Sequence, residues 1–413
     1  MAATDPEILL ASLEELKCQP PTDEKTRSRL SQALHHALMA IERPLDTVRR
    51  ISFAPLQLTM TKVAMDLNLF ELLASDGRPK SLGELVELTG AQSLLLRRIL
   101  RYLSGYDLVH EPKVDCFEAS PATQVLALPG FRAGINHHFE IQLPAWQTLP
   151  SFLAANEYCS PSDSSRTAFQ QAHGTELTAF AWAMDKPHIF KEFSLWMTAQ
   201  RHGQPTWMDV FPLGRLKCGR DNHTNTQYSE ADVDGEEHVA PFFVDIGGGM
   251  GHQCLALVNR LGPELGTRRR IILEDVPAVL SHAISHPRID RLVHDFWGPQ
   301  PIRGASFYYM RNVLHDYPDD KCVQLLRLQS EAMAPDGSSS LLIDEMVFPE
   351  IGAGPRAVEM DLAMMACLAA RERTKDEWEK LFRAARLSLV ETFTYASDMS
   401  QSIMVVKRLD STG

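Results

Sequence analysis

The sequence of 413 residues lacks any apolar run long enough to span a membrane and any cysteine pair in CxxC spacing. Its longest apolar candidate, residues 363–370, falls well short of the roughly 18 residues that a spanning helix needs. The opening MAATDPEILL has no basic stretch before an apolar one, so we expect no secretory signal. The seven cysteines are scattered and odd in number. They favour free thiols in a cytoplasmic protein over a disulfide framework or a structural zinc site.

Positive charge is also in short supply. The chain has 41 Lys and Arg against 53 Asp and Glu, a net charge of −12. Such a surface repels the phosphates of nucleic acids. The hydrophobic fraction of 44% is ordinary for a globular protein, and a chain this long can bury a sizeable core as two or three domains.

Residues 1–130 are expected to form a helical N-terminal domain that ends in a winged-helix-like unit. Two leucine-rich stripes at helical spacing, separated by Pro20 and Pro21, predict packing or dimerisation helices within residues 1–50. The stripes are Leu9, Leu13 and Leu16, and then Leu30, Leu34, Leu38 and Ile41.

The winged-helix pattern lies after residue 56. Residues 81–84 (SLGE) predict a capping box, Gly90 predicts the end of that helix, and a further helix is expected over residues 92–104. Two short β-like runs follow, at 108–110 and 116–118. In the helix before them Leu95, Ile99 and Leu103 are expected to face inward, and its basic residues are Arg97, Arg98 and Arg101. A DNA-binding protein would place such a helix in the major groove, but the net charge favours a solvated or dimer-facing role.

Residues 131–216 are helical in pattern and rich in aromatic residues and methionine. We expect a connector of which most apolar residues are core and some line an apolar ligand cavity. Residues 217–240 contain six acidic and two basic residues and little aliphatic periodicity, which predicts an exposed acidic linker.

Residues 241–413 alternate apolar β-like runs with helical stretches, which predicts a doubly wound α/β domain. Ligands of such domains bind beyond the carboxyl ends of the strands. The expected strands are 242–245, 270–274, 292–294, 306–310, 340–344, 389–393 and 403–407.

The strongest motif is VDIGGGMGH, residues 244–252. A buried strand ends in Asp245, and a glycine loop then opens a helix. Glycines allow a ligand to approach the backbone closely. The GK[ST] ending of a P-loop is absent, and Asp245 suits an ammonium group better than a pyrophosphate. A tight strand–helix turn without a ligand is the alternative.

Acidic residues follow the next two strands. Asp275 ends the second strand, where a carboxylate can hold the hydroxyls of a ribose. After the third strand, Asp295 can accept from an adenine amino group while Phe296 stacks on its ring. Each acid alone could be a solvated surface residue, but together they outline a nucleoside site.

His315 lies just past the fourth strand, and Glu345 and Glu372 follow at the same sheet edge. This set suggests an imidazole base oriented by carboxylates. A His/Glu metal site is the alternative, weakened by the absence of close ligand pairs, so we expect no metal. Asp319 or Asp320 is expected to cap the helix that comes next.

The motif order VDIGGGMGH, EDVP, HDFW, RNVLHDYPDDKC, LLIDE and RERT resembles the class I S-adenosylmethionine-dependent O-methyltransferases of the plant caffeate/flavonoid and fungal secondary-metabolite type. The resemblance covers about residues 50–410. It implies a Rossmann-like catalytic domain at 241–413 that uses S-adenosyl-L-methionine. It also implies that a winged-helix domain precedes this domain in the chain and makes the protein a homodimer. The family usually has a shorter connection where residues 217–240 stand.

The resemblance also implies roles for individual residues. Asp245, Gly247, Gly249 and Gly251 would hold the methionine part of the cofactor, Asp275 its ribose, and Asp295 and Phe296 its adenine. Arg311 matches a position that is usually basic beside the adenine. His315 matches the catalytic base, and Glu345 and Glu372 match the two acids that flank it. Substrate-lining candidates are Phe180, Trp182, Met184, Met197, Met364 and Met365.

We therefore expect methyl transfer to a phenolic or enolic hydroxyl of a small hydrophobic metabolite. One alternative is a pericyclase-like enzyme on the same scaffold that uses the cofactor only as a fixed charge. The intact set of His315, Glu345 and Glu372 argues against it, because such an enzyme has less need of a base. A winged-helix DNA-binding regulator is the other alternative.

Overall fold

The computed structural model describes residues 5–200, 203–217, 241–266, 269–396 and 399–409. Apart from Lys217, the expected acidic linker therefore lies outside the described residues. The chain divides into two compact units, Met1–Val63 and Ala64–Gly413. Among the described residues, no helix is both long enough and apolar enough to cross a membrane.

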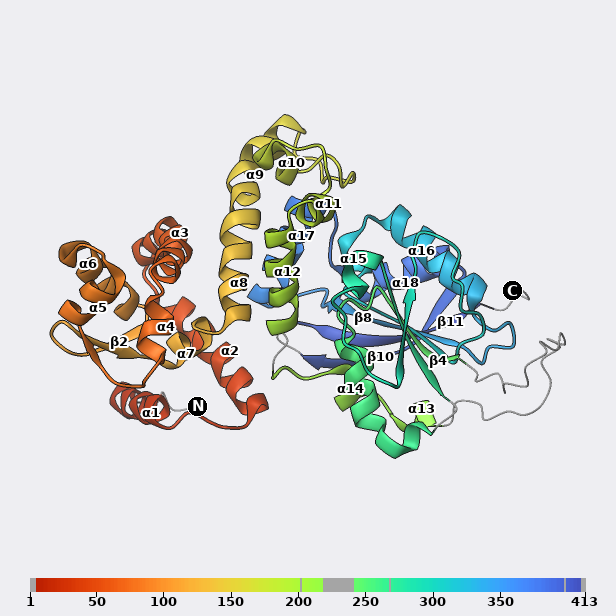
Figure 1. Ribbon diagram of the computed structural model, residues 1–413, viewed down its shortest axis with the longest axis horizontal. Coiled ribbons are helices and arrows are strands. Elements are labelled where there is room, and N and C mark those ends of the chain that lie inside the picture. Colours follow the sequence, from red (N-terminus) through yellow and green to blue (C-terminus); the bar gives the residue numbers. More distant parts are fainter. Residues whose placement is uncertain (1–4, 201–202, 218–240, 267–268, 397–398, 410–413) are drawn as a thin grey trace. The chain divides into compact units, whose positions relative to one another are not determined.

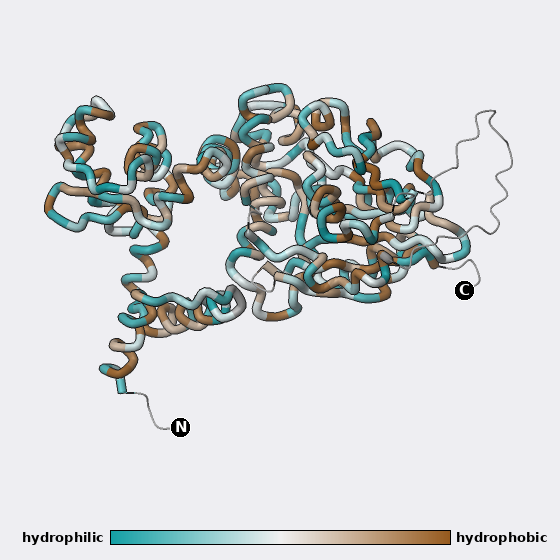
Figure 2. Tube along the Cα trace, turned by 60° about the horizontal axis from the view of Figure 1, so that its bottom comes forward, coloured by the Kyte–Doolittle hydropathy of each residue, from teal (hydrophilic) through white to brown (hydrophobic). Residues whose placement is uncertain are grey.

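The first unit contains the two predicted N-terminal helices, α1 (Pro6–Cys18) and α2 (Glu24–Ile41). The longer α3 (Pro44–Asp66) follows them, and its last residues belong to the second unit. An aspartate caps each of the first two helices: Asp5 accepts from the Glu7 amide, and Asp23 accepts from the Thr26 amide. Hydrophilic and hydrophobic residues alternate along these helices (Figure 2). Many of their large apolar side chains are exposed, among them Ile8, Leu9, Leu10, Leu38, Ile41, Leu45 and Ile51.

The second unit begins with the winged-helix-like part. It contains α4 (Leu69–Ala74), α5 (Leu82–Thr89), α6 (Ser93–Ser104) and α7 (Pro121–Leu126). Its antiparallel sheet has the order β1 (Lys80–Ser81), β3 (Cys116–Ala119), β2 (Val109–Lys113). The two runs at 108–110 and 116–118 are therefore confirmed as strands, and β1 was not predicted.

Local details of this part follow the sequence closely. The Ser81 side chain accepts from the Glu84 amide, and Gly90 ends α5 with a φ of 69°, as predicted. On α6 the prediction for Leu95 was wrong. Leu95 is 49% exposed and Leu96 is buried in its place, because the buried face is one residue further along. Arg97 makes a bidentate ion pair with Asp115, at 2.7 Å for both bonds.

The connector is helical, as expected. Glycines let two of its helices, α8 and α12, approach closely: a Cβ on Gly134 would lie 2.5 Å from the Trp196 ring. Its elements are α8 (Pro129–His137), a π-helical turn η1 (His138–Gln142), α9 (Leu143–Ala155), α10 (Ala168–His173), α11 (Ala179–Met184), α12 (Pro187–Ala199), η2 (Trp207–Asp209) and α13 (Gly214–Lys217).

A mixed sheet forms the centre of the C-terminal part. Its order is β10-β11-β8-β7-β4-β5-β6, with β9 paired to β8. Strands β4 to β8 run parallel, whereas β11 pairs antiparallel with both of its neighbours, β8 and β10. The strands are β4 (Pro241–Ile246), β5 (Arg270–Asp275), β6 (Ile289–Val293), β7 (Phe307–Arg311), β8 (Ser340–Phe348), β9 (Arg373–Thr374), β10 (Leu387–Ala396) and β11 (Gln401–Arg408).

Helices cover both faces of this sheet, as the continuous apolar strands predicted (Figure 1). On one face pack α16 (Asp319–Ala332) and α18 (Lys375–Ala384). On the other face pack α14 (His252–Leu261), α15 (Pro277–Leu280) and η2. The third strand lies earlier than predicted, because β6 ends at Val293 and His294 lies in the loop.

Candidate active site

The glycine loop joins the carboxyl end of β4 to α14. A Cβ on Gly248 would lie 2.5 Å from Asp245 Cγ and 2.5 Å from Leu273 Cδ1, so no larger residue fits there without movement. Three other glycines adopt the left-handed backbone that favours glycine: Gly247 (φ 65°), Gly249 (φ 60°) and Gly251 (φ 82°). The loop is thus shaped for a ligand that contacts its backbone.

Asp275 connects the end of β5 to this loop. Its Oδ2 accepts from the Gly249 amide and its Oδ1 from the Val276 amide, both at 2.8 Å. Burial raises the pKa of Asp275, and the two amides oppose this shift. The carboxylate is therefore held in one orientation beside the glycine loop.

Phe296 lies on the other side of the loop. A Cβ on Gly247 would be 3.4 Å from the Phe296 ring, so the ring faces the loop. The ring also meets Tyr317 edge-on, with centroids 6.2 Å apart. Asp295, the preceding residue, accepts from the Trp297 amide at 3.1 Å. The Phe296 ring therefore adjoins the glycine loop, and Asp295 directly precedes it in the chain. The nucleoside role of both residues remains a prediction.

Asp245 is almost fully buried at the end of β4. The Cys254 thiol donates to its Oδ2 at 3.3 Å. Burial raises the pKa of Asp245 to about 7. A cationic group beside this carboxylate would stabilise its charged form. The site therefore fits the ammonium group of an amino acid.

Arg311 pairs with a residue that the sequence did not single out. Its Nε lies 3.4 Å from Asp344 Oδ2, and Asp344 also accepts from the hydroxyls of Tyr309 and Tyr395 at 2.6 and 2.7 Å. The Arg311 charge also acts on Asp245. Arg311 thus pairs with Asp344, inside β8, and its positive charge favours the ionised form of Asp245, near the end of β4. Asp344 and Tyr309 lie within predicted strands, and Tyr395 lies in β10 beyond the predicted 389–393. Nothing in their spacing marked these three residues.

His315 lies on η4 (Leu314–Asp316), a short 3-10 turn just past β7. Its Nδ1 is 2.8 Å from Glu372 Oε1, and its Nε2 is 3.4 Å from Asp316 Oδ1. An ionised Glu372 accepts a hydrogen bond from Nδ1–H, which leaves Nε2 as the nitrogen that can take up a proton. The structure therefore brings His315 and Glu372 together in the carboxylate–imidazole arrangement expected from the sequence.

Glu345 holds the same turn in a different way. Its Oε1 accepts from the backbone amides of Val313 and Leu314, both at 2.9 Å, so it fixes the start of η4. Burial raises the pKa of Glu345 to about 7. Its Oε2 and the Oε2 of Glu372 are buried without a hydrogen-bond partner in the described structure. Such orphaned oxygens are typical of a functional site.

The charges around His315 control its protonation. Burial alone lowers the pKa of His315, but the negative charges of Asp316, Glu372 and Glu345 outweigh it and raise the pKa to about 10. The ring is therefore protonated at neutral pH in the protein without ligands. Asp316, directly after His315, is a site residue that the sequence reasoning missed.

The same residues could be considered as metal ligands. One donor atom each from His315, Glu345 and Glu372 lie within 4.8 Å of one another. However, Glu345 Oε1 already accepts two amides, and His315 Nδ1 faces Glu372. The donors are thus engaged with one another and with the backbone, and the absence of a metal remains a prediction.

The six substrate-lining candidates do not form one group. Met364 is buried on α17 (Pro355–Leu368) in a cluster against which Trp146 packs, and Met365 is next to it. This helix packs against η4, close to His315. The sequence reasoning did not select Trp146.

The other four candidates belong to α11 and α12. Phe180 packs against Phe190 and Phe193, and Trp182 packs against Phe169. Phe180, Met184 and Met197 are each at least one-third exposed. Trp182 also packs against a cluster that contains Ala366 and Cys367 of α17, the helix that packs against η4.

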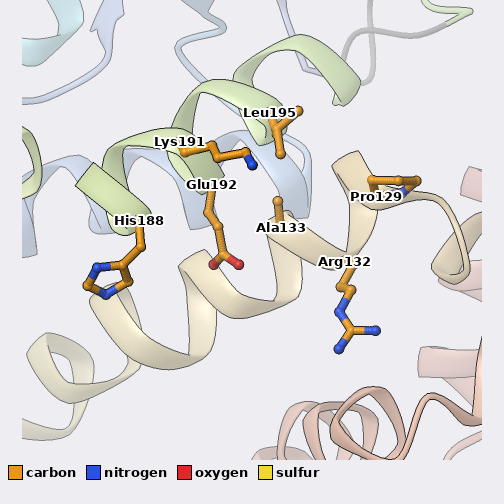
Figure 3. Close-up of a pocket in the computed structure, with 7 residues that line it drawn as sticks. All are labelled: Pro129, Arg132, Ala133, His188, Lys191, Glu192 and Leu195. Atoms are coloured by element: carbon orange, nitrogen blue, oxygen red, sulfur yellow. The ribbon is translucent and has the colours of Figure 1, made fainter. Parts of the chain in front are cut away.

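A separate pocket of about 340 Å³ lies between α8 and α12 (Figure 3). It contains none of the predicted site residues. Its lining residues are Pro129, Arg132, Ala133, His188, Lys191, Glu192 and Leu195.

Comparison with known proteins agrees with this geometry. Residues 236–388 match the O-methyltransferase domain, and residues 58–127 match the O-methyltransferase dimerisation domain. O-methyltransferase lepI of Aspergillus flavus is 34% identical over 93% of this chain and 95% of its own. Demethylsterigmatocystin 6-O-methyltransferase of Aspergillus parasiticus is 33% identical over 98% of both.

A solved structure of LepI in complex with SAM has a TM-score of 0.86 and 32% identity, over 98% of this chain and 100% of its own. The chain therefore belongs to the S-adenosylmethionine-dependent O-methyltransferase family, with a dimerisation domain before the catalytic domain. It is an enzyme of the type found among fungal secondary-metabolite O-methyltransferases.

Proposed function

We propose that this enzyme methylates a phenolic or enolic hydroxyl of a small hydrophobic metabolite, with His315 as the general base. The observation that carries the proposal is the 2.8 Å contact between His315 Nδ1 and Glu372 at the carboxyl edge of the sheet. This contact leaves Nε2 to accept the proton of the hydroxyl.

The residues around the glycine loop fit the cofactor. Asp245 would face its ammonium group, Asp275 its ribose hydroxyls, and Asp295 and Phe296 its adenine. Gly247, Gly249 and Gly251 would give it access to the backbone, and Arg311 would lie beside its adenine. When bound, S-adenosylmethionine supplies a methyl group activated by its sulfonium.

The chain's own residues then have two tasks, to orient the hydroxyl and to remove its proton. A phenol has a pKa of about 10 and is mostly protonated at neutral pH. Neutral His315 would take this proton at Nε2, and Glu372 would stabilise the resulting imidazolium. A positioned base of this kind contributes typically about 10²–10⁴-fold to the rate.

We propose that the acceptor lies against α17, where Met364 and Met365 are close to η4, and that Trp146 forms part of the same wall. Apolar and sulfur-containing side chains suit a hydrophobic ligand. The four candidates on α11 and α12 remain predictions.

We also propose that the enzyme is a homodimer through its N-terminal domain. The match to a dimerisation domain and the exposed apolar side chains of α1 to α3 support this. The six described cysteines are free thiols, which supports a cytoplasmic location.

A non-methylating reaction is the second candidate. A solved structure described as a pericyclic reaction enzyme is 32% identical, with a TM-score of 0.86 over 97% of this chain and 100% of its own. The raised pKa of His315 also favours an imidazolium, which donates a hydrogen bond to a carbonyl rather than accepting a proton.

The two functions separate in one assay. Cofactor carrying a labelled methyl group is incubated with the enzyme and a panel of phenolic and enolic acceptors, in parallel with and without a metal chelator. We expect label in the organic product. Product formation without label would support the second candidate, and loss of activity with the chelator would restore the metal alternative.

A further inference from the structure

Arg373 is a fully buried arginine beside the proposed active site. It directly follows Glu372 and begins the short strand β9, where it pairs with Val347 of β8. Burying a guanidinium is costly unless its donors are satisfied. The hydrogen-bond partners of Arg373 therefore indicate which segments its side chain stabilises.

Its donors converge on the turn that carries His315. Nη1 donates to the Leu314 carbonyl at 3.2 Å, and Nη2 donates to the Tyr317 carbonyl at 2.9 Å. Nε and Nη2 also bind Asp319 Oδ1, at 2.9 and 2.8 Å. The guanidinium thus grips the backbone on both sides of His315.

The turn is therefore held at both ends. Glu345 binds the amides of Val313 and Leu314 at its start, and Arg373 binds the carbonyls of Leu314 and Tyr317. The expectation that Asp319 or Asp320 caps α16 was wrong, because the N-cap position is Pro318. The Asp319 carboxylate binds Arg373 instead.

Arg373 also fixes the segment that carries Glu372. Its guanidinium lies over the Trp378 ring, 5.1 Å from the centroid, and the Trp378 indole donates to the Met346 carbonyl at 2.9 Å. One side chain therefore ties the turn that carries the imidazole to β9, the strand that directly follows Glu372.

We propose that Arg373 is a positioning residue that sets the contact between His315 and Glu372 by clamping the η4 backbone to β9. This inference rests on the proposed function of His315 as base. A lysine cannot replace it fully, because one ammonium cannot reproduce the planar fork that reaches two carbonyls and a carboxylate.

The chain offers a matched control two residues earlier. Arg371 also binds Asp319, at 2.9 Å, but its side chain is 43% exposed and its other ion pair is with Glu377. Arg371→Gln therefore removes an Asp319 partner without removing the clamp.

The test compares Arg373→Gln, Arg373→Lys and Arg371→Gln by kcat, by KM for both substrates, by the pH dependence of kcat and by calorimetric binding of the demethylated cofactor. We expect Arg373→Gln to lower kcat by about 10–100-fold, since a small misplacement of a reacting group can cost about 10²-fold. Cofactor affinity should stay within about twofold, because the clamp does not touch the glycine loop. The acid limb of the kcat profile should move to lower pH, because a looser contact with Glu372 lowers the pKa of His315. Arg373→Lys should recover part of kcat, and Arg371→Gln should match the wild type.

If Arg373→Gln does not fold, Asp319→Asn tests the same clamp, because Asp319 is the half-exposed partner of Arg373. We expect it to lower kcat less than Arg373→Gln would. Wild-type kcat and pH profile in a folded clamp variant would overturn the proposal. So would a loss explained entirely by a smaller fraction of protein that binds the cofactor product. Full activity of His315→Ala would overturn the proposed function itself, whatever the clamp variants do.

Discussion

At the residue scale, the two glutamates near His315 have different tasks. Glu372 contacts the imidazole, whereas Glu345 binds the backbone amides of the turn that carries it. Both add negative charge, which with Asp316 raises the pKa of His315 to about 10. The ring must lose its proton before it can act as a base, so methylation should become faster as pH rises toward this pKa.

Removing the Glu372 charge should shift this dependence. In Glu372→Gln the imidazolium loses a stabilising partner, so the pKa of His315 falls and the acid limb of the kcat profile moves to lower pH. The maximal rate should also fall, because the amide stabilises the imidazolium less. The measurement is steady-state kcat between pH 6 and 10, with Glu379→Gln, at a surface ion pair of α18, as the control. An unchanged acid limb in Glu372→Gln would mean that Glu372 does not set the protonation of His315.

The sequence could predict part of this site. His315, Glu345 and Glu372 were selected because each lies near the carboxyl edge of the predicted sheet. The contact of Glu345 with backbone amides could not be predicted, because it depends on the 3-10 turn at η4. The role of Arg373 could not be predicted for a similar reason. Its partners are mostly backbone carbonyl oxygens, which every residue has, so no residue type in the sequence indicates them.

At the scale of elements, the glycine loop between β4 and α14 has no room for a larger side chain at Gly248. In Gly248→Ala the new Cβ would meet Asp245 and Leu273 at 2.5 Å. Overpacking of this kind costs typically about 1–3 kcal/mol. We expect cofactor affinity to fall by about tenfold or more, since tenfold corresponds to about 1.4 kcal/mol.

Calorimetry with the demethylated cofactor measures this effect. Gly214→Ala is the control, because a Cβ on Gly214 would meet no atom within 4 Å beyond its chain neighbours. The affinity of this control should therefore match the wild type. Equal affinity for Gly248→Ala and the wild type would show that the loop does not hold the cofactor as proposed.

The main elements of the fold could be predicted because apolar runs and caps mark them. The parallel strands, the capping box at Ser81 and the end of α5 at Gly90 are all confirmed. The strands β1 and β9 were missed because two residues carry no periodicity. The π-helical turn η1 was also missed, since it continues the helical pattern on either side.

At the scale of the whole molecule, the first unit leaves apolar side chains of α1 to α3 exposed. Ile41 is 78% exposed and Leu38 is 52% exposed on α2. Burial of such a side chain contributes about 1.5–3 kcal/mol, so a partner chain would gain from covering them. We expect the wild type to sediment as a dimer at micromolar concentration.

The double variant Leu38→Asp/Ile41→Asp should shift this equilibrium toward monomer, because association would bury two charges. Ile351→Asp is the control, since Ile351 is 91% exposed and belongs to the second unit. Analytical ultracentrifugation measures the outcome. A double variant that remains as dimeric as the wild type would place the interface elsewhere.

The most direct test of the account is the transfer of labelled methyl from cofactor to acceptor by His315→Ala, with cofactor binding measured on the same protein. We expect unchanged affinity for the demethylated cofactor and a loss of methyl transfer of about 10²–10⁴-fold, the contribution of a general base. Methyl transfer at the wild-type rate by a variant that binds the cofactor normally would contradict the account.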